Sequence, residues 1–193
     1  GLKAEDYDAE RVEINDLYTG YLELPVPGAL VDSLYKNGEA DLDLPDHYPN
    51  QFVILKDEQN PSHSALAKFS PSRGPNKVVL VLRSSKDGVW GIRPRNMEQT
   101  LALDLLLNDE VKLLTIVGKA GTGKTLLAIA AGLQKTMEEQ YFQKLLVSRP
   151  IFPLGRDIGF LPGSVEEKLN PWMQPIFDNV EFLMNLSRSD KKS

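Results

Sequence analysis

Short apolar stretches separated by prolines and glycines fill the first ninety residues. Four of them have the alternation or the apolar density of a β-strand: 11–15, 41–44, 51–56 and 77–83. A helix over about 28–37 is expected among them, because Pro27 precedes apolar residues at three- and four-residue spacing and Gly38 follows them. The pattern therefore predicts a small β-rich module, barrel-like or an open sheet, over residues 1–92.

The period of the apolar positions changes after Pro94. The expected elements are a helix at 96–108 with Asn96 as N-cap, a strand at 111–117, a helix from 125 to about 140, and a strand at 144–148. The helical spacing of 164–186 is interrupted at Pro171 and Pro175. Because a strand–helix–strand order builds parallel sheets covered by helices, residues 93–193 are expected to contain part of a parallel-sheet α/β core.

The composition excludes several kinds of site. The chain has no cysteine, hence no disulfide, thiolate nucleophile or cysteine-bound metal, and its two histidines argue against a multi-histidine metal centre. These features fit a reducing compartment, and we expect a cytoplasmic location. The longest uncharged run of the most apolar region has ten residues, too few for a membrane span. The first residue is Gly1 and no apolar leader follows, so we expect an internal piece of a longer protein.

Charge is distributed unevenly along the chain. Residues 1–60 carry four basic and fourteen acidic side chains, net −10, whereas residues 61–193 carry eighteen basic and thirteen acidic ones, net +5. Because phosphate binding requires local positive charge, a nucleic-acid surface is expected in the second part. The alternative is an acidic solvated face followed by a mildly basic remainder.

One segment matches the phosphate-loop pattern G-x-x-x-x-G-K-[ST] at every fixed position: Gly118, Lys119, Ala120, Gly121, Thr122, Gly123, Lys124 and Thr125. Glycines permit backbone angles that turn successive N–H groups toward phosphates, and the following helix adds the positive end of its dipole. Lys124, the catalytic candidate, supplies a charge for the β- and γ-phosphates of ATP, and the Thr125 hydroxyl is placed to ligate Mg²⁺. The alternative is a glycine-rich turn that binds nothing.

An amide side chain precedes this loop. Gln99 carries a donor and an acceptor side by side, as the exposed edge of adenine requires, so it is a candidate for selecting ATP. The alternative is an ordinary exposed helix residue.

A loop rich in glycine, proline and arginine follows the strand predicted at 144–148. Such loops, at the carboxyl ends of parallel strands, border the ligand site of open α/β sheets. Arg149 and Arg156, together with Lys168, are therefore candidates for binding the phosphates of a nucleic acid or of a neighbouring subunit's nucleotide. Alternatively, these cations pair with nearby acids and only shape the loop. Four further residues are expected to be structural: His47, His63, Trp90 and Trp172.

Three stretches together, 93–99, 118–125 and 148–178, closely resemble the PhoH-like ATPases. Residues 17–20 and 49–64 look like the connecting module of the branch that fuses a PIN ribonuclease domain to PhoH. The resemblance implies a P-loop NTPase fold, ATP dependence, kinship with superfamily 1 helicases and action on single-stranded RNA, with a homo-oligomeric ring as a further possibility. By position, it assigns adenine reading to Gln99, the Walker roles to Lys124 and Thr125, and the next helicase-like motif to Arg149.

Two features of that family have no counterpart in the sequence. No apolar run after Thr125 ends in the Asp or Asp-Glu that P-loop hydrolases use to hold Mg²⁺, and no PIN-type acidic cluster precedes residue 11. We therefore expect an ATP- and magnesium-binding part of a helicase-related ATPase that alone hydrolyses ATP hardly above background. The main alternative is a non-catalytic module in which bound nucleotide orders the 149–163 loop for a partner. A small-molecule kinase fits less well, because such enzymes usually have their phosphate loop near the N-terminus.

Overall fold

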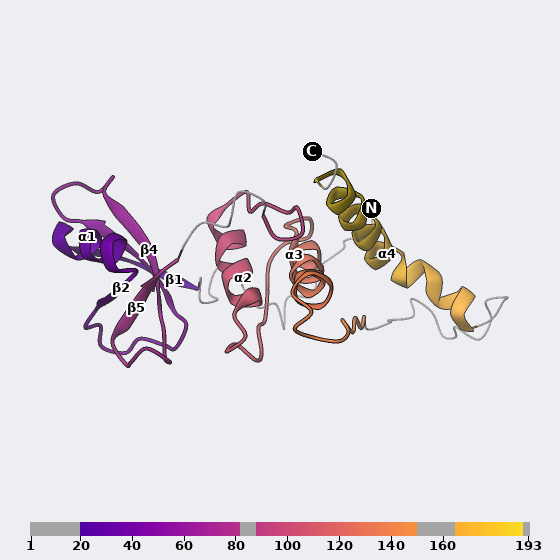
Figure 1. Cartoon of the computed structure of the whole chain (residues 1–193), viewed down its shortest axis with the longest axis horizontal. Helices are drawn as coiled ribbons and strands as arrows, with labels where there is room; N and C mark the ends of the chain where they lie inside the picture. The colour runs from indigo at the N-terminus through magenta and orange to yellow at the C-terminus, as the bar shows by residue number, and fades with distance from the viewer. Residues whose placement is uncertain (1–19, 82–87, 150–164, 191–193) are drawn as a thin grey trace, which may run out of the picture. The chain divides into compact units, whose positions relative to one another are not determined.

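The computed structural model describes residues 20–81, 88–149 and the backbone of 165–190, with side chains of the last segment described over 173–186 (Figure 1). The strand predicted at 11–15, Arg156 and the side chain of Lys168 lie outside the described part. The chain divides into two compact units, Gly1–Leu82 and Arg83–Ser193, which are described separately. The predicted division into domains 1–92 and 93–193 stays a prediction.

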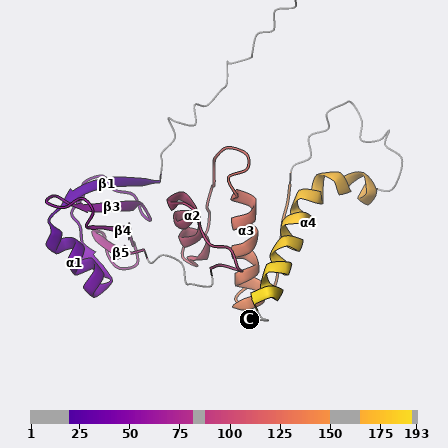
Figure 2. The same ribbon diagram turned by 90° about the horizontal axis from the view of Figure 1, so that it is seen from above.

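The first unit is an open mixed sheet with one helix. Its elements are β1 (Tyr21–Val26), α1 (Gly28–Asn37), β2 (Glu39–Asp41), β3 (Phe52–Asp57), β4 (Ser64–Phe69) and β5 (Lys77–Leu80). The strand order is β1-β3-β4-β5-β2, with β1 parallel to β3 and every other pair antiparallel. In Figure 2 the labelled strands β1, β3, β4 and β5 follow one below another with α1 beside them, and α1 contacts β2, β3, β4 and β5.

The core of the first unit lies between α1 and the sheet. Val31 and Leu34 of α1 are fully buried, and they belong to one apolar cluster with Val53, Leu55 and other strand residues. The register pairs Val53 with Ala67 and Leu55 with Ala65, so these side chains share one face of the sheet. Each fully buried large apolar side chain contributes about 1.5–3 kcal/mol relative to exposure.

The helix predicted at 28–37 is confirmed, as are the strand at 51–56, observed over Phe52–Asp57, a strand in 77–83, observed over Lys77–Leu80, and the open-sheet form of the module. The strand predicted at 41–44 is wrong beyond Asp41, because β2 pairs with β5 only through Glu39–Asp41. Two observed strands, β1 and β4, were not predicted. β1 contains Pro25, which a strand tolerates at the edge of a sheet, where one row of N–H groups has no ladder partner.

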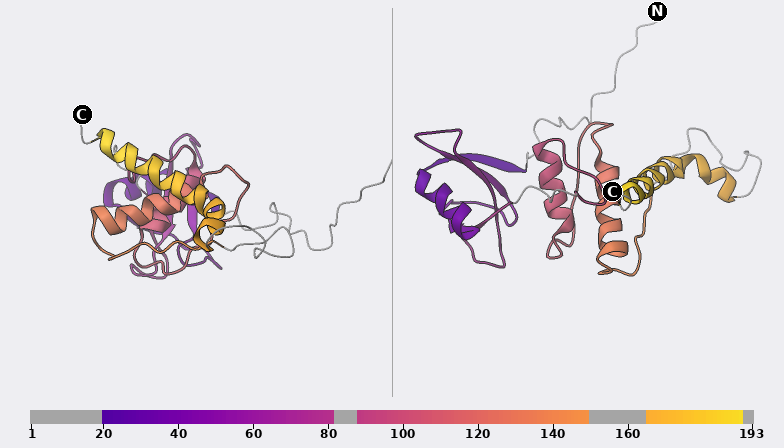
Figure 3. Two further views of the ribbon diagram at one scale, coloured as in Figure 1. Left: turned by 90° about the vertical axis from the view of Figure 1, so that its right-hand side faces the viewer. Right: turned by 45° about the horizontal axis from the view of Figure 1, so that its top comes forward.

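The second unit is helical in its described part. It contains α2 (Met97–Leu107), α3 (Lys124–Leu133), a π-helical turn η2 (Gln134–Glu138) that extends α3, and α4 (Val165–Asp190). α2 and α3 run side by side in both views of this unit, and α3 also contacts α4 (Figures 2 and 3). One apolar cluster joins them, with Leu127 and Ile129 of α3, Leu103 of α2 and Leu183 of α4 buried. Trp90 belongs to the same cluster, as its expected structural role implies.

Two predicted strands are not formed. Residues 111–117 and 144–148 are described, but neither pairs with another strand, so the expected parallel pair is absent from the described residues. A short parallel pair needs neighbouring strands and apolar cover on both faces. In the described part of the second unit neither is present: Leu113 is 87% exposed and Leu146 is 80% exposed. Both segments have the apolar composition of strands, but the prediction that they are strands is wrong because neither has a pairing partner among the described residues.

The predicted interruption of the last helix is also wrong, since α4 continues through Pro171 and Pro175. A proline inside a helix removes one backbone hydrogen bond and bends the axis, and the ribbon of α4 is visibly bent (Figure 2). The side chain of Asn179 donates to the Pro175 carbonyl oxygen at 2.5 Å. Packing of Ile176 and Leu183 in the apolar cluster of the second unit favours the continuous helix.

Candidate nucleotide-binding site

Two glycines shape the loop that matches the phosphate-binding pattern. Gly121 and Gly123 have φ angles of 77° and 86°, a left-handed conformation that side-chain-bearing residues rarely adopt. A Cβ on Gly121 would meet no atom within 4 Å, so the requirement there is conformational rather than steric. A Cβ on Gly123 would lie 3.4 Å from Nε2 of Gln99, so the loop and the Gln99 amide are also close together.

Lys124 folds back over the loop that precedes it. Its Nζ donates to the carbonyl oxygens of Gly118 at 2.8 Å and Lys119 at 2.7 Å, and to Oγ1 of Thr122 at 3.4 Å. Thr122 Oγ1 in turn donates to the Lys119 carbonyl oxygen at 2.9 Å. The ammonium group is thus held at the loop by neutral acceptors, and an anionic phosphate oxygen is a stronger acceptor than any of them.

The N-terminus of α3 carries no local anion. Gly123 is its N-cap, no side chain caps it, and its first turn contains no acidic residue. The first N–H groups and the positive end of the helix dipole are therefore available to an anion. Thr125 lies exposed in this first turn. The described residues contain no group of three or more His, Cys, Asp or Glu that could hold a metal ion, so a cation here would depend on the Thr125 hydroxyl, phosphate oxygens and water.

Gln99 reaches the loop from the first turn of α2. Asn96 caps that helix by accepting from the Gln99 backbone N–H at 2.9 Å, which orients the turn. The Gln99 side chain accepts from the Arg95 N–H at 2.8 Å and donates to the Thr122 carbonyl oxygen at 3.3 Å. A residue 23 positions from Thr122 in sequence thus contacts the loop, which joins the two sequence-predicted parts of the site.

The proposed nucleic-acid residues are less defined. Arg149 is exposed and follows the unpaired segment 144–148. The loop after it, including Arg156, lies outside the described residues, so its position relative to the phosphate loop stays a prediction.

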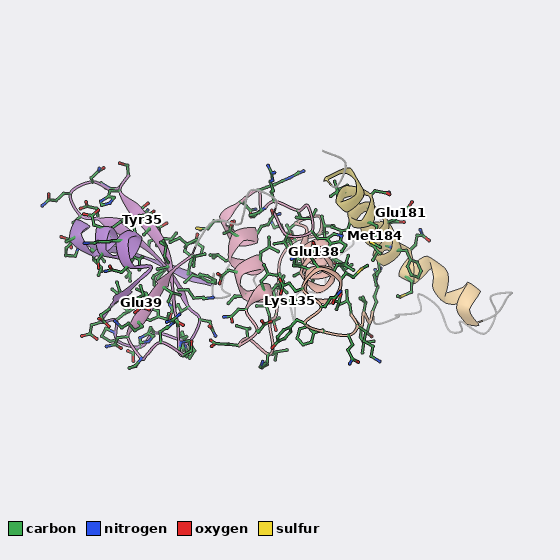
Figure 4. The ribbon with its side chains drawn as sticks, in the orientation of Figure 1. Tyr35, Glu39, Lys135, Glu138, Glu181 and Met184 are labelled. Atoms are coloured by element: carbon green, nitrogen blue, oxygen red, sulfur yellow. The ribbon has the colours of Figure 1, made fainter. Side chains whose placement is uncertain are left out.

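Lys135 is a supporting residue that sequence reasoning missed (Figure 4). It is 8% exposed and forms ion pairs with Asp109 at 3.0 Å and Glu139 at 2.9 Å. Burial lowers its pKa, but the hydrogen bonds to Glu139 and Asp109 outweigh this and leave the pKa above its ordinary value. Lys135 thereby links the end of α3 to the turn that leads into 111–117. The i,i+4 spacing to Glu139 was the available sequence signal.

No helix of the described segments is long and apolar enough to cross a membrane.

Comparison with known proteins finds one family and relatives that carry its name. Residues 91–192 match the PhoH-like protein family. Protein PhoH2 of Bacillus subtilis (strain 168) is 50% identical over 97% of this chain and 43% of its own length. Protein PhoH2 of Mycolicibacterium smegmatis is 39% identical over 95% of this chain and 40% of its own length. Protein PhoH2 of Thermobispora bispora is 36% identical over 93% of this chain and 40% of its own length. No solved structure matches the chain.

The chain thus spans about four tenths of the length of these three relatives. The family match contains the whole phosphate loop, the Gln99 turn and the helices around them. The chain belongs to the PhoH-like protein family, a family of P-loop proteins that generally bind ATP.

Proposed function

We propose that the chain binds ATP with magnesium at residues 118–125. The observation that carries the proposal is the Lys124 ammonium, held at the loop by neutral acceptors beside an α3 N-terminus that has no acidic residue. A triphosphate would take over these hydrogen bonds and accept others from the first N–H groups of α3. Thr125 would contribute a hydroxyl ligand to the magnesium ion, which polarises the phosphates.

Gln99 would read the adenine base. Its amide has two N–H groups and an oxygen with two lone pairs, and the contacts with Thr122 and Arg95 use one of each. One donor and one acceptor are left, which matches the amino group and ring nitrogen on the exposed edge of adenine. The existing contacts would hold the amide in place, so little rotamer entropy is lost on binding.

In the intact protein we propose ATP hydrolysis linked to single-stranded RNA, with Lys124 stabilising charge on the transferred phosphoryl group. The net +5 of residues 61–193 and the exposure of Arg149 support an RNA surface in the second part. For the chain alone we propose binding without appreciable turnover. Fusion to a PIN domain and assembly into a ring belong to the same proposal for the intact protein.

Titration calorimetry with Mg²⁺ and ATP tests the nucleotide site. Lys124→Ala should weaken binding about ten- to a hundredfold, since a charge-assisted hydrogen bond contributes about 1.5–3 kcal/mol. Lys144→Ala is the matched control, because it removes an exposed lysine of the same unit that lies outside residues 118–125. Equal ATP affinity of the wild type and Lys124→Ala would refute the site.

Gln99→Ala separates base reading from phosphate binding. It should reduce the preference for ATP over GTP while both nucleotides still bind. An unchanged preference for ATP over GTP would refute the role of Gln99 in adenine recognition without affecting the proposed phosphate site.

RNA binding is tested by fluorescence anisotropy at several salt concentrations. Arg149→Ala should reduce the salt slope by about one unit, because one phosphate contact is lost. Lys36→Ala, which removes an exposed lysine from the acidic residues 1–60, should leave the slope unchanged. Unchanged RNA binding together with altered sedimentation of Arg149→Ala would favour a contact with a neighbouring subunit instead.

A further inference from the structure

Both histidines of the chain lie in the first unit, and each presents its two ring nitrogens to oxygen atoms. His47 has Nδ1 at 2.8 Å from the Leu44 carbonyl oxygen and Nε2 at 2.6 Å from the Pro75 carbonyl oxygen. A carbonyl oxygen only accepts, whereas a neutral imidazole has one donor and one acceptor. A neutral His47 ring can therefore donate to only one of these two carbonyl oxygens, and which one depends on the tautomer.

His47 also contacts an aromatic ring. It stacks on Phe69 with 3.9 Å between centroids and 17° between planes. Among the described residues no charged side chain pairs with His47, so its contacts are two carbonyl oxygens and this ring.

His63 has a carboxylate at each nitrogen. Its Nδ1 lies 3.0 Å from Asp57 Oδ2 at the end of β3, and its Nε2 lies 3.2 Å from Asp32 Oδ1 on α1. The hydrogen bond to Asp57 is the largest cause that raises the pKa of His63 above its ordinary value, against a smaller opposing effect of burial. The same hydrogen bond lowers the pKa of Asp57.

These contacts connect parts of the unit that are distant in sequence. His47 links the segment between β2 and β3 to the turn before β5, and His63 links α1 to the turn between β3 and β4. The start of α1 lies close to the Asp57 carboxylate, since a Cβ on Gly28 would lie 2.5 Å from Asp57 Oδ2. Beside His63, Tyr35 of α1 donates its hydroxyl to the Ser64 carbonyl oxygen at 2.8 Å and needs no titrating group to do so (Figure 4).

We propose that the first unit is a proton-sensitive module, in which His63 acts as a doubly protonated clamp between Asp57 and Asp32 whose deprotonation loosens the packing of α1 on the sheet. For His63 the folded pKa is raised, so its stabilisation is fully present below the ordinary pKa of 6.5 and is lost as pH rises through the folded pKa. For Asp57 the folded pKa is lowered, so its stabilisation is present above 3.8 and is lost at lower pH. The unit is then most stable between these two limits.

Nuclear magnetic resonance of the two imidazole rings in the full 193-residue chain tests the protonation directly. At pH 6 the long-range proton–nitrogen spectrum should show both nitrogens of the His63 ring protonated, with this ring distinguished from that of His47 through Asp32→Asn, which shifts only His63. A neutral His63 ring with one bare nitrogen at pH 6 would overturn the clamp.

Amide hydrogen exchange of the β3–β4 ladder, corrected for the intrinsic rate, measures the consequence. The opening equilibrium constant should rise between pH 6 and pH 8, by up to tenfold per pH unit for each linked proton. Asp32→Asn should reduce that rise only in part, because Asp57 still holds the protonated His63 ring, and the variant is expected to fold because the Asp32 side chain is 74% exposed. Tyr35→Phe is the control: it should increase opening at every pH without changing the pH dependence. An opening constant independent of pH in the wild type would overturn the proposal.

Discussion

The two units differ in how they use their apolar side chains. In the described part of the first unit two large apolar side chains are at least half exposed, Tyr35 and Tyr48. In the described part of the second unit eight are: Leu113, Val117, Met137, Tyr141, Phe142, Leu146, Phe177 and Phe182. Paired strands close the first core, whereas the segments on either side of α3 in the second unit pair with nothing described. The difference shows that the phosphate loop keeps its shape through local hydrogen bonds rather than through a sheet.

The largest expected effect contrasts one leucine from each unit. Leu55 is fully buried in the first core and Leu113 is 87% exposed in the second unit. Leu55→Ala should destabilise the first unit by about 2–5 kcal/mol, because it leaves a cavity, while Leu113→Ala should change stability by no more than about 0.5 kcal/mol.

Urea unfolding with two probes measures this contrast. Protection of the β3–β4 amides reports the first unit, and fluorescence reports the second, because Trp90 and Trp172 both belong to it. Similar losses for the two variants would mean that the exposure difference between the units does not govern their stability.

An intermediate effect is expected at Lys135. Lys135→Met should destabilise the second unit by about 1–2 kcal/mol, because Asp109 and Glu139 lose their cation but remain 40% exposed and partly hydrated. Lys144→Met, at an exposed position of the same unit, is the matched control and should be near neutral. Fluorescence-detected unfolding of both variants decides; if they unfold alike, the Lys135 ion pairs contribute no measurable stability.

A smaller effect is expected at the cap of α2. Asn96→Ala should cost about 1 kcal/mol and weaken ATP binding a few-fold, because Asn96 orients the turn that carries Gln99. Glu98→Gln in the same turn keeps the cap and serves as control. Wild-type ATP affinity of Asn96→Ala in calorimetry would show that the Asn96 cap does not affect nucleotide binding.

Elements with signals inside their own sequence were predictable. Pro27 and Gly38 delimit α1, and Asn96 marks the start of α2. β4 escaped notice because Ala65, Ala67 and Lys68 lack the composition of a strand, and it forms through its pairing with β3 and β5. Pairing explains the opposite error at 111–117, where the composition is right but no partner strand is described.

The site followed the same rule. The glycines at 121 and 123 and the helix starting at Lys124 were readable from the phosphate-loop pattern, because that pattern encodes local backbone geometry. The contact of Gln99 with Thr122 and the ion pairs of Lys135 join distant residues, and only a fold brings these together.

Amide hydrogen exchange with and without Mg²⁺ and ATP tests most directly whether the locally held loop is the nucleotide site. We expect new protection confined to residues 118–126, with no change in the β3–β4 ladder, and its loss in Lys124→Ala. Protection that appears elsewhere, or that persists unchanged in Lys124→Ala, would contradict the account.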